Sequence, residues 1–135
     1  MTLFQVLTAE SRIMERDVNY YGEGNAIIRR YGECASVPVI NMADDVCHPC
    51  QGLADILGWA ERFSGVNAEV DFSTLQGKKL LLTWSKGNLA RSWNSPQETL
   101  MLASRYGVNI TIARPEGYDF DPEVYKTVEE NLKPY

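Results

Sequence analysis

The sequence predicts an α/β protein built on parallel sheet, and three observations lead to this expectation. Apolar runs of strand length alternate with segments whose apolar residues have helical spacing. Residues 79–84 read as a continuous apolar strand, typical of a parallel strand that is covered on both faces. The second half of the chain reads strand, loop, helix, strand, helix, which implies a right-handed crossover in an open sheet. We therefore expect parts of two α/β units joined by a helix.

The first half of the chain is expected to hold a buried strand between two helices. Residues 1–14 suit a helix or a helix–strand pair, and residues 25–31 suit a short helix that ends at Gly32. The strand is predicted at residues 37–42. The helix after it has Pro49 in its first turn. Its apolar positions are Leu53, Ile56, Leu57, Ala60 and Phe63.

The second half supplies the clearest start and stop signals. A helix is predicted from about Pro96 to Tyr106, with Gly107 as its stop, and residues 108–113 alternate as a strand. Asp121 is expected to cap a last helix that runs to Asn131. A change of composition at residues 67–77 predicts a domain boundary, with residues 1–70 on one side and 71–135 on the other.

Composition excludes several classes of function. The chain has 135 residues, 44% of them hydrophobic, and a net charge of −5, which argues against a large nucleic-acid footprint. No apolar run reaches the length that spans a bilayer, and no secretory signal is visible. The three cysteines are an odd number and favour a reducing compartment, so we expect a cytoplasmic protein without membrane contact.

Two strand ends are the expected positions for ligands, because open α/β sheets bind them at the carboxyl ends of strands. These are the turn after Met42 and the loop after Trp84. The only histidine, His48, lies at a predicted helix start, and Gln51 follows three residues later on the same side of the first turn. Together they can donate hydrogen bonds to a carbonyl oxygen and its amide partner. The alternative is a histidine satisfied by backbone groups and a glutamine near a cap.

Several segments in the right order resemble one enzyme family. The string HPCQ at residues 48–51, with VPVIN at 37–41 before it and LADIL at 53–57 after it, is similar to the HPxQ segment of the aspartate and ornithine carbamoyltransferase superfamily. Residues 77–84, 96–97, 105–107 and 114–118 continue the resemblance, which covers most of the chain from about Arg12 onward. The loop at residues 85–95 resembles the branch with a knotted backbone, which is related to acetylornithine carbamoyltransferase.

The resemblance implies an incomplete, three-layer, Rossmann-like carbamoyltransferase architecture. Residues 1–70 would form the C-terminal part of a carbamoyl-phosphate-binding domain, and residues 71–135 the N-terminal part of an amine-binding domain. The implied activity is transfer of the carbamoyl group of carbamoyl phosphate to the amine of an amino acid or a related small molecule. No cofactor and no metal are implied, and relatives form trimers, so a homotrimer is expected for the full-length form.

The resemblance also implies roles for individual residues. His48 would donate to the carbonyl oxygen of carbamoyl phosphate, Gln51 would contact its amide group, and Arg16 would hold its carbonyl and phosphate oxygens. Negative charge grows on the carbonyl oxygen during attack, and one preorganised donor stabilises such charge by about 3–4 kcal/mol. For Arg16 the alternative is a surface salt bridge.

The second substrate is expected to contact polar residues near both strand ends. In the loop after Trp84 the candidates are Asn88, Arg91, Trp93 and Asn94. The alternative for them is a solvated loop. One of Asp44 and Asp45 would orient the attacking amine, and the alternative for either is a helix-capping carboxylate.

The chain also departs from the family pattern. It contains no Ser-Thr-Arg-Thr-type string for the phosphate and no late His-Cys-Leu-Pro-type loop. We therefore expect a fragment with weak or no activity on its own, and no knot within these residues.

Three other classes remain as alternatives. Cys47 and Cys50 form a Cys-x-x-Cys at a helix start, as in thioredoxin-like thiol–disulfide proteins, but such a domain also needs a cis-proline facing the dithiol. A metal site from Cys34, Cys47, His48 and Cys50 is disfavoured because neighbouring residues rarely bind one tetrahedral ion. A non-catalytic remnant or interaction module would share the sequence features of the fragment.

Overall fold

The structure is a computed structural model that describes residues 2–5, 21–85 and 93–135. The chain separates into two compact units, one formed by Met1–Gln51 with Lys86–Ser95 and the other by Gly52–Ser85 with Pro96–Tyr135. This division follows contacts between residues. The domain boundary between residues 70 and 71 stays a prediction.

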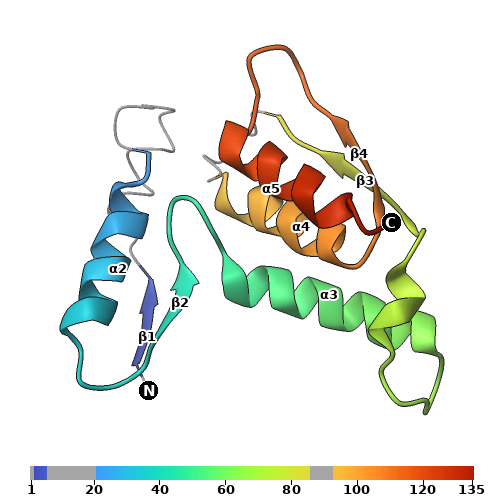
Figure 1. The fold of residues 1–135 in the computed structure, drawn as a ribbon, viewed down its shortest axis with the longest axis horizontal. Coiled ribbons are helices and arrows are strands. Elements are labelled where there is room, and N and C mark those ends of the chain that lie inside the picture. Colours follow the sequence, from blue (N-terminus) through green and yellow to red (C-terminus); the bar gives the residue numbers. More distant parts are fainter. Residues whose placement is uncertain (1, 6–20, 86–92) are drawn as a thin grey trace. The chain divides into compact units, whose positions relative to one another are not determined.

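The described residues of the first unit form a parallel pair of strands and one helix. Strand β1 (Thr2–Gln5) pairs with β2 (Val39–Ala43), with Thr2 opposite Val39 and an irregularity between Phe4 and Gln5. Helix α2 (Glu23–Cys34) lies alongside this pair (Figure 1) and buries Ile28. Strand β2 ends at Ala43, which is fully buried. The turn that follows therefore begins at the carboxyl end of a parallel strand.

The second unit has the predicted strand–helix–strand–helix order. Strand β3 (Lys79–Thr83) pairs in parallel with β4 (Asn109–Ala113), so the expected parallel sheet is confirmed. Helices α4 (Asn94–Arg105) and α5 (Pro122–Leu132) pack on one face of this pair (Figure 1). Their contact with the sheet is centred on the buried residues Leu82, Leu100, Phe120 and Val124.

A second cluster surrounds α3 (Pro49–Ser64) and the short 3-10 helix η2 (Phe72–Leu75). Its buried members are Ile56, Ala60, Leu75, Ala103 and Val108. Only some of the predicted apolar positions of α3 are therefore buried. Leu53 and Leu57 are 58% and 44% exposed, because Ile56 and Ala60 occupy the face that packs.

Two expectations about the fold are wrong. Strand β3 is not covered on both faces within the described residues, because Leu81 is 64% exposed while Leu82 is buried against α4 and α5. Contrary to the sequence prediction, helix α2 does not end at Gly32. The helix continues to Cys34, and the N–H of Ala35 donates to the Tyr31 carbonyl at its end.

Other boundaries agree with the sequence. Gly65 after α3 and Gly107 after α4 have φ values of 104° and 67°, which glycine adopts without a steric penalty. Asp121 caps α5, because its carboxylate accepts the N–H of Glu123 at 2.9 Å. Of residues 1–14, the structure shows a strand at Thr2–Gln5, and residues 6–14 lie outside the described part.

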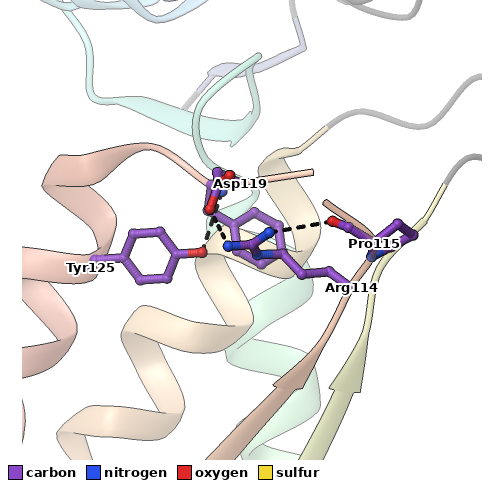
Figure 2. Close-up of polar contacts among 5 residues, drawn as sticks. Arg114, Pro115, Asp119 and Tyr125 are labelled. Carbon is purple, nitrogen blue, oxygen red and sulfur yellow. Dashed lines mark hydrogen bonds and ion pairs between the residues drawn. The ribbon is translucent and has the colours of Figure 1, made fainter. Parts of the chain in front are cut away.

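The connection from β4 to α5 is held by its own polar contacts (Figure 2). Arg114 donates to the Pro115 carbonyl at 3.3 Å and forms an ion pair with Asp119. The N–H of Phe120 donates to the Tyr125 hydroxyl at 3.4 Å. These contacts fold the predicted turn back toward α5 at the carboxyl end of β4.

Candidate functional site

The turn between β2 and α3 is the feature that presents the candidate residues. The N–H of Asp44 donates to the Cys47 carbonyl at 2.9 Å and closes the turn. The Asp44 Oδ1 atom accepts the N–H groups of Val46 and Cys47, each at 2.7 Å. Because α3 begins at Pro49, this turn delivers His48 to the N-terminal end of the helix.

His48 is half-buried and its ring has a defined hydrogen bond. The N–H of Gln51 donates to His48 Nδ1 at 3.3 Å and to the His48 carbonyl at 3.0 Å. A neutral imidazole whose Nδ1 accepts carries its proton on Nε2. His48 therefore offers an Nε2–H donor, which no described residue uses.

Gln51 lies in the first turn of α3, three residues after His48, as the sequence predicted. Its backbone N–H fixes the histidine ring, while the residue itself is exposed. This end of the helix also carries the positive end of the helix dipole. The pair thus combines one oriented ring donor with a helix N-terminus, an arrangement that suits a carbonyl oxygen on which negative charge develops.

Asp45 acts as a cap for a different helix. It is fully buried, and its Oδ2 accepts the N–H groups of Gly22 at 2.6 Å and Gly24 at 3.2 Å. Its Oδ1 accepts the N–H of Asn25 at 2.8 Å. Gly22, the N-cap residue of α2, has no side chain for this task, so Asp45 supplies the acceptor from 20 or more residues away.

Asp44 is also fully buried, and both of its oxygens are occupied. Besides the two turn N–H groups on Oδ1, its Oδ2 accepts from the side-chain amides of Asn25 at 2.6 Å and Asn41 at 2.7 Å. Four donors fill the acceptor positions of one carboxylate. Asp45 thus accepts the N–H groups at the start of α2, whereas Asp44 binds its own turn and two asparagine amides. Contact of either carboxylate with an amine stays a prediction.

Sequence reasoning missed Asn25 and Asn41, whose amides complete this network. Asn41 lies in a predicted strand, three residues before the first of two aspartates, and that pattern is the one signal that could have singled it out. Its Oδ1 is buried and accepts no hydrogen bond in the described structure.

Asn94 and Trp93 belong to the same unit as the turn. Asn94 is buried, and its Nδ2 donates to the main-chain carbonyl of Asp44 while its Oδ1 accepts the N–H of Ser95 at 2.7 Å. The Trp93 ring meets the Tyr21 ring edge-on, with centroids 5.2 Å apart. The structure thus brings Trp93 and Asn94 beside the turn, and it gives Asn94 a protein partner on each side of its amide.

The remaining predicted residues, Arg16, Asn88 and Arg91, lie outside the described part of the chain. Within the described ranges, no group of three or more histidine, cysteine or acidic side chains is arranged to hold a metal ion. The same ranges contain no cis peptide bond, so the cis-proline that a thioredoxin-like site requires is not found there.

Similarity to known proteins shows the family of the chain. No family model matches the chain. The putative carbamoyltransferase YgeW of Escherichia coli is 32% identical over 130 residues, which cover 87% of this chain and 31% of that protein. The chain belongs to the carbamoyltransferase superfamily. A second carbamoyltransferase, the ornithine carbamoyltransferase of Thermococcus kodakarensis, is 39% identical over 98 residues, which cover 72% of this chain and 26% of that enzyme.

Solved carbamoyltransferase structures share the fold and point to one branch. An N-acetyl-L-ornithine transcarbamylase mutant complexed with PALAO has a TM-score of 0.73 and 28% identity, over 87% of this chain and 33% of that one. Another mutant, complexed with carbamyl phosphate and N-succinyl-L-norvaline, has a TM-score of 0.69 and 27% identity, over 83% and 32% of the two chains. The acetylornithine-like branch of the carbamoyltransferases therefore fits, and the chain spans about a third of the length of these relatives.

Proposed function

We propose that this chain supplies the carbonyl-binding part of a carbamoyltransferase active site. The reaction would move the carbamoyl group of carbamoyl phosphate to the amine of an amino acid or a related small molecule. The observation that carries the proposal is the orientation of His48, whose Nδ1 accepts the Gln51 N–H and whose Nε2–H is left to donate. The homology to carbamoyltransferases supports the same reaction.

The chemistry requires donors at the carbonyl oxygen. The amine nitrogen attacks the carbonyl carbon, and the C=O electrons move onto oxygen. The carbonyl then re-forms as the C–O bond to phosphate breaks, and the proton that the amine loses leaves with the phosphate. His48 Nε2–H would donate to that oxygen throughout, and Gln51 would hold the amide of the carbamoyl group. Arg16 would neutralise the carbonyl and phosphate oxygens as charge accumulates on them.

The amine would be held by residues from the loop after β3. Asn88, Arg91 and Trp93 remain the proposed contacts. A solved relative was complexed with carbamyl phosphate together with N-succinyl-L-norvaline, which supports carbamoyl phosphate and an amino-acid-like partner as the substrate classes. Asn94 is better placed as a structural residue, since both ends of its amide are engaged by the protein.

The setting of the enzyme is part of the proposal. We propose a cytoplasmic protein and a homotrimer in the full-length form, with no nucleic acid or membrane partner. The net charge of −5 supports the first exclusion. No helix in the described residues is long and apolar enough to cross a membrane. We expect carbamoyl transfer by the 135-residue chain alone to be weak or absent, because the sequence has no Ser-Thr-Arg-Thr-type string for the phosphate.

The test is binding of carbamoyl phosphate to the chain, measured by titration calorimetry and by NMR of the imidazole ring. His48 is the only histidine, so its ring signals need no assignment. We expect saturable binding that shifts the Nε2–H signal. His48→Ala should weaken binding by about tenfold or more, as expected for loss of a hydrogen bond to a charged group.

Glu116→Gln is the control, because Glu116 is exposed in the connection from β4 to α5 and should leave the affinity unchanged. A folded chain that shows neither heat nor a ring shift at millimolar ligand would refute the proposal. Equal affinities of the wild type and His48→Ala would remove His48 from the site.

A further inference from the structure

We propose that Asp44 is a positioning residue for His48. Its buried carboxylate would fix the turn that aims the imidazole, and would influence carbonyl binding without touching the substrate. The inference rests on the proposed role of His48 and assigns Asp44 a function that differs from an amine contact.

The first argument is the geometry of the turn. Asp44 Oδ1 accepts two consecutive backbone N–H groups, from Val46 and Cys47, at 2.7 Å each. The Asp44 N–H closes the same turn on the Cys47 carbonyl at 2.9 Å. An aspartate that binds its own following backbone in this way fixes the local chain direction. His48 follows directly, so its entry into α3 depends on these bonds.

The second argument is the attachment of the turn to the rest of the first unit. Asp44 Oδ2 accepts from Asn25 on α2 at 2.6 Å and from Asn41 on β2 at 2.7 Å. The Asp44 carbonyl accepts from Asn94, which is 50 residues away in the sequence. The turn is thus fixed to a helix, to a strand and to the segment that returns from the loop after β3. A site on a turn this firmly tied is preorganised, as a carbonyl-binding donor requires.

The third argument is the contrast with the neighbouring residue. Asp45 has the same side chain and the same full burial, but among the described residues its carboxylate accepts only from the N-terminus of α2. None of its hydrogen bonds involves the backbone of residues 46–48. A comparison of variants at the two aspartates can therefore distinguish a general loss of stability from a specific effect on the His48 ring.

The experiment compares Asp44→Asn with Asp45→Asn. The readouts are the imidazole nitrogen chemical shifts of His48 without ligand, the affinity for carbamoyl phosphate and the thermal unfolding midpoint. In the wild type, the shifts should show protonated Nε2 and accepting Nδ1. Asp44→Asn should move the shifts toward a mixture of tautomers and weaken carbamoyl phosphate binding by about tenfold. Asp44→Asn and Asp45→Asn should lower the thermal unfolding midpoint by similar amounts. Asp45→Asn should nevertheless leave the ring shifts of His48 as in the wild type.

Asn94→Ala is the milder variant if Asp44→Asn does not fold. It removes one hydrogen bond to the Asp44 carbonyl and keeps the carboxylate, so it should shift the His48 signals in the same direction by less. Unchanged ring shifts in the variants of Asp44 and Asn94, or an equal change in Asp45→Asn, would overturn the positioning role. If the wild type fails to bind carbamoyl phosphate, the proposed function fails, while the ring shifts of the free protein still decide the role of Asp44.

Discussion

Gly52 of α3 lies against Glu98 of α4 so closely that a Cβ atom at Gly52 would be 2.5 Å from the Glu98 Cγ. The same Cβ would be 2.7 Å from the Leu102 Cδ1. Glu98 is buried, so its side chain has little freedom to move away. The glycine that directly follows the HPCQ string is therefore required by helix packing in the second unit.

We predict that Gly52→Ala destabilises the protein. Overpacking costs about 1–3 kcal/mol, which outweighs the helix propensity of about 1 kcal/mol gained from alanine. Gly58→Ala is the matched control in the same helix, because nothing lies within 4 Å of its Cβ position. It should be neutral or stabilising by up to about 1 kcal/mol. Urea unfolding measures both, and equal free energies for the two variants would contradict the packing argument.

The cap that Asp45 provides to α2 gives a second prediction. Asp45→Ala leaves the N–H groups of Gly22, Gly24 and Asn25 without their acceptor, which should cost about 2–3 kcal/mol. Amide hydrogen exchange at Gly24 and Asn25 should accelerate accordingly. Glu23→Gln alters an exposed charge in the same helical turn and should change stability by less than about 1 kcal/mol. Protection of these amides at the wild-type level in Asp45→Ala would contradict the capping role.

Asn131 connects α5 to α4 and should matter for the second unit. Its Nδ2 donates to the Met101 carbonyl at 3.0 Å and to the Ser104 hydroxyl at 2.9 Å, and Ser104 is fully buried. Asn131→Ala should lower the free energy of unfolding by about 1–2 kcal/mol. Glu130→Ala, at an exposed neighbouring position, should change it by less than about 0.5 kcal/mol. Chemical denaturation would contradict the prediction if the two variants were equally stable.

Asp71 supplies a pH-dependent prediction. The Ser73 side chain, and then the Ser73 N–H at 2.9 Å, donate to its carboxylate and hold the pKa of Asp71 below its ordinary value. A pKa that is lower in the folded state means that the contribution to stability is present above the unfolded pKa. It is lost as the pH falls through the folded pKa.

NMR titration of the Asp71 carboxyl carbon tests this relationship. Ser73→Ala removes the largest cause and should raise the pKa of Asp71 toward its ordinary value. Thr74→Ala is the control, because the Thr74 hydroxyl donates to the Asp71 main-chain carbonyl and not to the carboxylate. A Ser73→Ala protein with an unchanged Asp71 titration would show that the hydroxyl is not the cause.

Local signals in the sequence were enough to predict much of the framework. Asp121 before Pro122 predicted the start of α5, and Gly65 and Gly107 predicted the ends of two helices. The HPCQ string after an apolar strand predicted His48 at a helix start. Such features depend on interactions among residues that are close in sequence. A short segment therefore contains all the interacting residues and is enough to predict them.

Burial on each face of a strand was not predictable in the same way. Leu81 and Leu82 are identical in type and adjacent in sequence, yet Leu81 is 64% exposed and Leu82 only 8%. Their difference arises because α4 and α5 both pack on the face that carries Leu82. The apolar string itself contains no information about which layer covers it.

By itself, the sequence determined the parallel α/β class, the Asp121 cap of α5, and the position of His48 just before α3 with Gln51 in its first turn. Only the tertiary structure decided which protein groups Asp44 and Asp45 bind, and that Asn94 donates to the Asp44 carbonyl. The physical reason is distance along the chain. The partners of these side chains lie up to 50 residues away, and hydrogen bonds at such separation exist only once the strands and helices have come together.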